Sequence, residues 1–296
     1  MTAVEPSAAP GATARDGVAL PWRGVDDGSG SLARPPLPLP PGRMPLLRAR
    51  RPRKSWRYVG LYAQDVLLCA GRVSLGGAPQ TFWAVWDRGS RTLRERTRFV
   101  PGGVEVGDRV RFGGRGVRAD LALEPRGEAV EVVSPHGPSW IWTRKQGARV
   151  HGTLVLDGRR IAVDGPALID DSAGFHARET RWSWSAGAGV DEAGRQVLWN
   201  LCDGVHDDPA AGECTVWVDG VAVEAGPVRF DGLDAVHGPG DEVLRFAAEA
   251  QRARHDRLVL LDSAYRQPFG AFTGTLPGGV VLARGAGVME RHDVRW

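Results

Sequence analysis

The sequence has very little lysine and cysteine, and it has no long apolar segment. Lys54 and Lys145 are the only lysines among 38 basic residues, so arginine supplies almost all of the positive charge. The 35 acidic residues leave a formal net charge of +3, and the densest basic run, residues 48–57, does not continue along the chain. We therefore expect no nucleic-acid partner. No apolar run approaches the ~20 residues of a membrane span, so we expect no integral membrane association.

The three cysteines, Cys69, Cys202 and Cys214, are an odd number and lack the spacing of a disulfide framework. This pattern favours a reduced compartment, and no basic segment followed by an apolar one resembles a secretory signal. We therefore expect a cytoplasmic protein. Residues 202–214 also contain histidine and acidic side chains, but their spacing matches no zinc pattern. We expect no metal and no organic cofactor.

The chain divides into a proline-rich beginning and a long β region. The first 43 residues are small, polar and rich in proline, which predicts a disordered tail outside the core. From Trp56 onward, aromatic and β-branched residues alternate with polar ones, and Asp157-Gly158 and Asp219-Gly220 predict type I′ hairpin turns. Residues 243–261 have a helix-forming composition, but their apolar positions also fit a period of two, and we predict a strand. The sequence is therefore typical of antiparallel barrels or sandwiches.

Several motifs in the β region occur together and in order. They are DDSAGFHARETRWSWSAGAG, VLWNLCDGVHD, ECTVWVDG and GVMERHDVRW. With these motifs, residues 44–296 resemble the bacterial "domain of unknown function 2804" family. More distantly, the chain is similar to carotenoid hydratases of the hydroxyneurosporene-synthase type. That resemblance implies an all-β fold of two consecutive antiparallel lipocalin-like barrels, with the first barrel in residues 44–175 and the second in residues 176–296.

The last strand carries the best catalytic candidates. Its alternation puts Val288, Glu290, His292, Val294 and Trp296 on one face, and the apolar members predict that this face points into the barrel. A carboxyl group and an imidazole side by side in a barrel lumen could transfer protons near neutral pH. The alternative is an internal ion pair or hydrogen-bonded clamp that closes the strand.

Asp170 and Asp171 form the second candidate site. Adjacent residues of an extended chain face opposite ways, so at most one of them can enter a cavity. Asp170 has the spacing to Gly174 that the resemblance implies for the functional aspartate. A protonated carboxylic acid there could protonate an alkene, whereas the alternative is an Asx turn at the bend between the barrels.

Two tryptophans on one strand face predict an apolar wall. Trp182 and Trp184 alternate with serines and offer flat surfaces suited to a polyene, terpene or acyl chain, and their ring faces could stabilise a carbocation. The alternative is that these indoles fill the core of a barrel. The predicted ligand-binding residues are His176, Trp182, Trp184, Trp199 and Asn200.

Together these features predict a cofactor-free acid–base enzyme, a hydratase, isomerase or cyclase, that acts on a lipophilic small molecule such as an isoprenoid, polyene or polyketide. The alternative is a non-catalytic protein that binds a lipid or isoprenoid. The two differ in whether a titratable group touches the ligand. The sequence leaves the identity of the ligand and the oligomeric state open.

Overall fold

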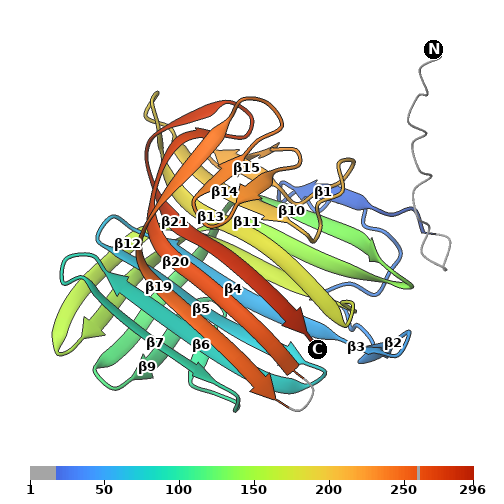
Figure 1. Ribbon diagram of the computed structural model, residues 1–296, viewed down its shortest axis with the longest axis horizontal. Helices are drawn as coiled ribbons and strands as arrows, with labels where there is room; N and C mark the ends of the chain where they lie inside the picture. The colour runs from blue at the N-terminus through green and yellow to red at the C-terminus, as the bar shows by residue number, and fades with distance from the viewer. Residues whose placement is uncertain (1–17, 259–260) are drawn as a thin grey trace.

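The structure is a computed structural model that describes residues 18–258 and 261–296, and its regular elements are all β-strands. In this described part of the chain there is no helix that could cross a membrane. Two large antiparallel sheets contain nearly all of the strands, and a short ribbon of β2 (Leu47–Arg48) and β3 (Arg51–Pro52) lies beside them. Figure 1 shows the two sheets curled and packed against each other.

The first sheet has ten strands and curls into a barrel. Its order is β7-β6-β5-β4-β12-β11-β10-β9-β8, with β1 added beside β10. The curl brings distant strands together, because Trp83 of β6 stacks on Phe112 of β9 with ring centroids 5.1 Å apart. The strands are β1 (Trp22–Asp26), β4 (Lys54–Tyr62), β5 (Val66–Leu75), β6 (Ala78–Asp87), β7 (Thr92–Arg98), β8 (Val104–Val106), β9 (Arg109–Gly114), β10 (Val117–His136), β11 (Ser139–Leu156) and β12 (Arg159–Gly174).

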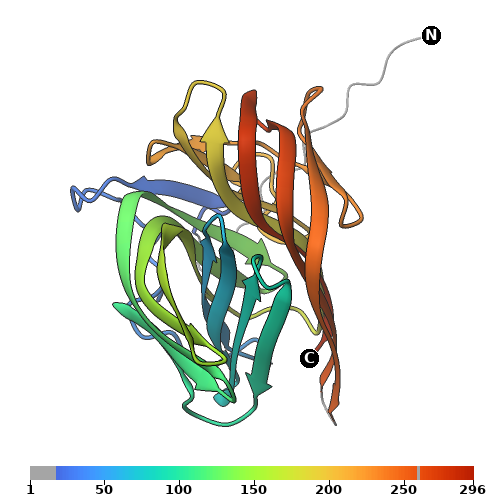
Figure 2. The same ribbon diagram turned by 90° about the vertical axis from the view of Figure 1, so that its left-hand side faces the viewer.

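The second sheet has nine strands in the order β16-β15-β14-β13-β21-β20-β19-β18-β17. It begins with β13, five residues after β12 ends. Figure 2 shows its long orange and red strands running alongside the first barrel. The strands are β13 (Glu179–Asp191), β14 (Gln196–Asp203), β15 (Thr215–Val218), β16 (Val221–Glu224), β17 (Arg229–Asp231), β18 (Ala235–His237), β19 (Val243–Leu258), β20 (Leu261–Leu276) and β21 (Val280–Arg295).

The local predictions for turns and strands are confirmed. Asp157 and Gly158 join β11 to β12 with φ of 49° and 86°, and Asp219 and Gly220 join β15 to β16 with φ of 50° and 85°. Both central residues have positive φ, as a type I′ turn requires. Residues 243–258, despite their helix-forming composition, form the single strand β19.

Both faces of the central strands are buried. In β4, Val59 and Leu61 belong to the apolar core inside the first barrel, whereas Tyr58 and Tyr62 point the other way into a second core. This second core, the interbarrel core, also contains Trp184 and other side chains of the second sheet. Because alternate residues reach different cores, the two barrels are joined by apolar packing, and the candidate site lies in that layer.

The structure corrects the predicted tail for residues 18–43. Strand β1 pairs with β10 through five residues, so this segment extends the first sheet. Leu20 and Leu39 are only 4% and 5% exposed, and they join a fourth apolar cluster on the first barrel. Isolated leucines among prolines can therefore bury against a preformed barrel, although they are too few to form a core themselves. Residues 1–17 lie outside the described residues.

We predict that Leu20→Ala lowers the free energy of unfolding by about 2–4 kcal/mol, because it removes buried methyl groups and leaves a cavity. Leu47→Ala is the matched control, since Leu47 is 62% exposed and its truncation should cost less than about 0.5 kcal/mol. Urea unfolding of the full chain measures both. Equal losses in the two variants would show that the proline-rich segment does not pack on the barrel.

Candidate functional site

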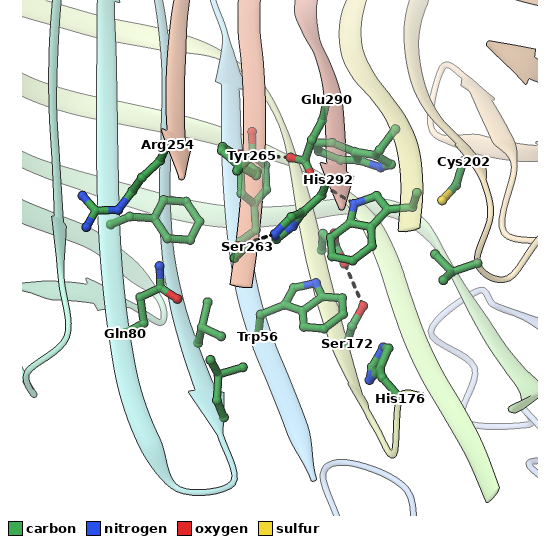
Figure 3. A pocket seen from close by; sticks show the side chains of 18 of the residues that line it. Trp56, Gln80, Ser172, His176, Cys202, Arg254, Ser263, Tyr265, Glu290 and His292 are labelled. Atoms are coloured by element: carbon green, nitrogen blue, oxygen red, sulfur yellow. Dashed lines mark hydrogen bonds between the residues drawn. The ribbon is translucent and has the colours of Figure 1, made fainter. Parts of the chain in front are cut away.

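A cavity of about 150 Å³ lies in the interbarrel core. An engineered cavity of similar size in another protein holds one benzene molecule, so this space suits a group the size of a small ring. Its aromatic lining comes from both sheets and includes Trp56, Tyr58, Phe82, Trp182 and Trp184. Figure 3 shows Glu290, His292 and Trp56 around this space.

Glu290 of β21 is a buried carboxyl group in the cavity wall. Its Oε1 accepts a hydrogen bond of 2.8 Å from Trp182 Nε1, and its Oε2 accepts bonds of 3.0 Å from Tyr265 and from Gln267 Nε2. Burial raises the pKa of Glu290 to about 7, although the hydrogen bonds from Trp182 and Tyr265 and the charge of Arg252 oppose that rise. A neutral acid and its carboxylate are therefore both accessible near neutral pH.

His292, two residues along the same strand face, is half-buried in the cavity wall. Its Nε2 is 2.8 Å from Ser263 Oγ, and its ring stands edge-on to Trp182 with centroids 4.3 Å apart. Burial lowers the pKa of His292 to about 3, so the imidazole is neutral at physiological pH. Glu290 and His292 thus hydrogen bond to separate partners rather than to each other, and both contact Trp182.

The predicted alternation of the last strand is correct, but the face that carries Glu290 and His292 does not point into a barrel as predicted. Met289 on one face packs in the core of the second barrel, whereas Val288 on the other packs in the interbarrel core. Glu290 and His292 share the face of Val288, so they lie between the barrels and not in a barrel lumen. An apolar pattern cannot distinguish these two positions, because both faces of the strand are buried.

Arg252 of β19 is a buried cation in the same wall, and sequence reasoning did not single it out. Its guanidinium lies over the rings of Phe82 and Tyr265, at 4.7 and 5.1 Å from the centroids, and its Nε is 3.2 Å from Glu95 Oε2. Tyr265 thus lies between Arg252 and Glu290, to which it donates a hydrogen bond.

A second polar cluster in the cavity wall consists of Lys145, Asp170 and Glu213. Lys145 Nζ is 2.6 Å from Asp170 Oδ1 and 3.4 Å from Glu213 Oε2, and all three side chains are buried. Burial raises the pKa of Glu213, although the charge of Lys145 opposes the rise. Sequence reasoning missed Lys145 and Glu213, but the rarity of lysine was a usable signal: both lysines of this arginine-rich chain are buried.

The two aspartates of the second predicted site point to opposite faces of β12. Asp170 lines the cavity, but Asp171 points away and pairs with Arg57 at 3.0 Å, in a separate hollow beneath the proline-rich segment. The 2.6 Å contact between Asp170 Oδ1 and Lys145 Nζ makes Asp170 the partner of a buried lysine. The Asx turn is excluded, since both aspartates lie within β12.

Of the predicted ligand-binding residues, His176, Trp182 and Trp184 line the cavity. Trp199 does not, which corrects that assignment: it is paired with Gly187 and packs in the core of the second barrel. Asn200 also does not line the cavity. It is fully buried behind Trp184, accepting a hydrogen bond of 2.8 Å from the indole Nε1.

A sequence-family model described as "Domain of unknown function (DUF2804)" matches residues 103–296. The chain belongs to this family. The match is shorter than the resemblance from residue 44 suggested, and it covers more than half of the chain, including all of the second sheet. No curated protein matches the sequence.

A solved structure with a similar fold supports the predicted all-β architecture of this DUF2804 protein. A structure provisionally identified as AttH of Nitrosomonas europaea has a TM-score of 0.54 at 15% identity, covering 81% of this chain and 92% of that one. Kievitone hydratase of Nectria haematococca has a TM-score of 0.49 at 9% identity, and the match covers 80% of this chain and 88% of that one. CghA in complex with Sch210972 has a TM-score of 0.40 at 11% identity, and the match covers 93% of this chain and 98% of that one. The last two scores are too low to add to what the first establishes about the fold.

We predict that the wild type loses stability relative to Glu290→Gln as the pH rises from about 4.5 to about 7. Because the pKa of Glu290 is higher in the folded than in the unfolded protein, the folded state holds the proton more tightly. The stability from this residue is therefore complete below pH 4.5 and is lost through pH 7, by up to about 3 kcal/mol.

Urea unfolding of both proteins across this pH range measures the difference. Asp164→Asn is the control, since Asp164 is exposed and a hydrogen bond from Arg149 lowers its pKa below the tested pH range. The difference in stability between Asp164→Asn and the wild type should therefore not change with pH. A constant stability difference between Glu290→Gln and the wild type would instead show that the pKa of Glu290 is not raised in the folded protein.

Proposed function

We propose that this protein is a cofactor-free acid–base enzyme, a hydratase, isomerase or cyclase, that acts on a lipophilic small molecule in the interbarrel cavity. The observation that carries the proposal is Glu290. It is a buried carboxyl group with a pKa of about 7, it borders a cavity with aromatic walls, and its three hydrogen-bond donors are all uncharged. An acid with such a pKa can both give and accept a proton near neutral pH.

In the proposed reaction, Glu290 transfers its proton to one carbon of a double bond and leaves a cation on the other carbon. Addition of water then gives hydration, loss of a neighbouring proton gives isomerisation, and attack by a second double bond gives cyclisation. In each case the proton released from water or from the substrate returns to the Glu290 carboxylate. The indole faces of Trp182 and Trp184 would stabilise the cation.

The other candidates take supporting roles in this proposal. With a pKa of about 3, His292 is too weak a base to accept a proton efficiently, and its contact with Trp182 suits a positioning residue. Asp170 would position Lys145 through their ion pair. The cavity volume favours a ring-sized group, so a longer isoprenoid, polyene or polyketide would extend past Arg254, Asp256 and Leu261. A cytoplasmic location stays a prediction.

All three reactions form a carbon–hydrogen bond with the solvent-exchangeable proton of Glu290. In D₂O the product must therefore carry deuterium on carbon, which mass spectrometry detects. The substrates are limonene, 1-methylcyclohexene and a lipid extract of the source organism. We expect incorporation with the wild type, a loss of about 100-fold or more in Glu290→Gln, and no change in Asp164→Asn.

Incorporation that persists in Glu290→Gln would contradict the role of this residue. The competing proposal, a non-catalytic lipid-binding protein, rests on the mostly apolar walls of the cavity. It predicts no deuterium incorporation by any variant, together with a lipophilic compound that native mass spectrometry detects on both the wild type and Glu290→Gln.

A further inference from the structure

The Lys145–Asp170–Glu213 cluster has no task in the proton transfer proposed for Glu290, yet it borders the same cavity. Figure 3 shows its neighbours Ser172 and Cys202 on the side of the cavity away from Arg254 and Gln80. Ser172 Oγ is 3.2 Å from Asp170 Oδ1. The three ionisable groups are between 2% and 8% exposed, and burying such groups is costly unless their hydrogen-bonding capacity is used.

Part of that capacity is unused in the described structure. Glu213 Oε2 is buried and accepts no full hydrogen bond; its contact with Lys145 Nζ is a long ion pair of 3.4 Å. His176 Nδ1, on another wall of the same cavity, is also buried without a partner. A buried polar atom without a hydrogen bond destabilises the fold, so these atoms point to a ligand that pairs with them.

We propose that this cluster is a polar subsite that binds a hydroxyl group of the ligand, whose ring occupies the aromatic part of the cavity. The proposal rests on the proposed binding of a lipophilic molecule there and narrows its class to ring-sized alcohols and phenols. A hydroxyl both accepts and donates, so it can accept a hydrogen bond from Lys145 Nζ and donate one to Glu213 Oε2. A hydrocarbon can do neither, and an ether can only accept.

The charges of the cluster also argue for a neutral group. Carboxyl oxygens of Asp170 and Glu213 flank Lys145 Nζ, so an anionic ligand would compete with them for the ammonium of the cluster. The ammonium of Lys145 lies between the carboxylates and would repel a cation. A neutral donor–acceptor group adds no charge to the buried cluster.

Isothermal titration calorimetry of the full chain with indane, 5-indanol and 5-methoxyindane tests the proposal. These probes share one ring system and differ in hydrogen bonding. We expect the wild type to bind 5-indanol about tenfold or more tightly than the other two, since hydrogen bonds to charged groups are worth at least that factor. Equal affinities for the three probes, or no binding of any, overturns the proposal without the need for a variant.

Glu213→Leu should remove the preference for 5-indanol and leave the affinity for indane unchanged, because the Lys145–Asp170 pair stays intact. Asp171→Asn is the matched control: this carboxyl group is in the same strand as Asp170 but faces away from the cavity, and the preference should persist. A preference that survives in Glu213→Leu contradicts the subsite.

Glu290→Gln separates this proposal from the proposed catalysis. It should keep the preference for 5-indanol while losing deuterium transfer. If deuterium transfer depends on Glu290 but the three probes bind equally, only the subsite is wrong. If no variant transfers deuterium but the preference exists and requires Glu213, only the catalysis is wrong.

Discussion

The central strands of this protein have two buried faces, and this constraint determines where polar side chains can lie. Tyr58 and Val59 are neighbours in β4, yet one belongs to the interbarrel core and the other to the core of the first barrel. A polar residue in such a strand has no route to water and must find partners within the protein. In the interbarrel core these partners come from both sheets, which is why polar groups gather around one cavity.

The two polar parts of the cavity show how environment separates similar groups. Glu290 and Asp170 are both buried carboxyl groups in strands, but Glu290 has only uncharged donors, whereas Asp170 contacts the ammonium of Lys145. Burial without a contacting cation favours a neutral acid, and an ion pair favours a carboxylate. Glu290 is thus a buried carboxyl group without an ion pair, and Asp170 is half of a buried ion pair.

An irregularity in β19 brings Arg252 into the cavity. The register with β20 shifts between Ala248 and Ala250, so the intervening Glu249 is an extra residue, as in a β-bulge. Before the bulge, Phe246 packs in the core of the second barrel, and after it Arg252 faces the cavity. Glu249 itself accepts hydrogen bonds from Trp86 and Arg88 of the first barrel, so the bulge also joins the two barrels.

The sequence by itself determined the strands, the two hairpin turns and which residues share a face, because these depend on local alternation and on backbone conformations that Asp-Gly favours. It thereby paired Glu290 with His292 and Trp182 with Trp184. Only the tertiary structure decided which of two buried faces points to the cavity, that Trp199 is in a barrel core, and that Leu20 packs on the first barrel. Only the tertiary structure shows that Lys145, Asp170 and Glu213, which come from separate strands and a loop, contact one another. The physical reason is that alternation fixes relative orientation along one strand, whereas curvature, bulges and sheet packing fix what each face meets.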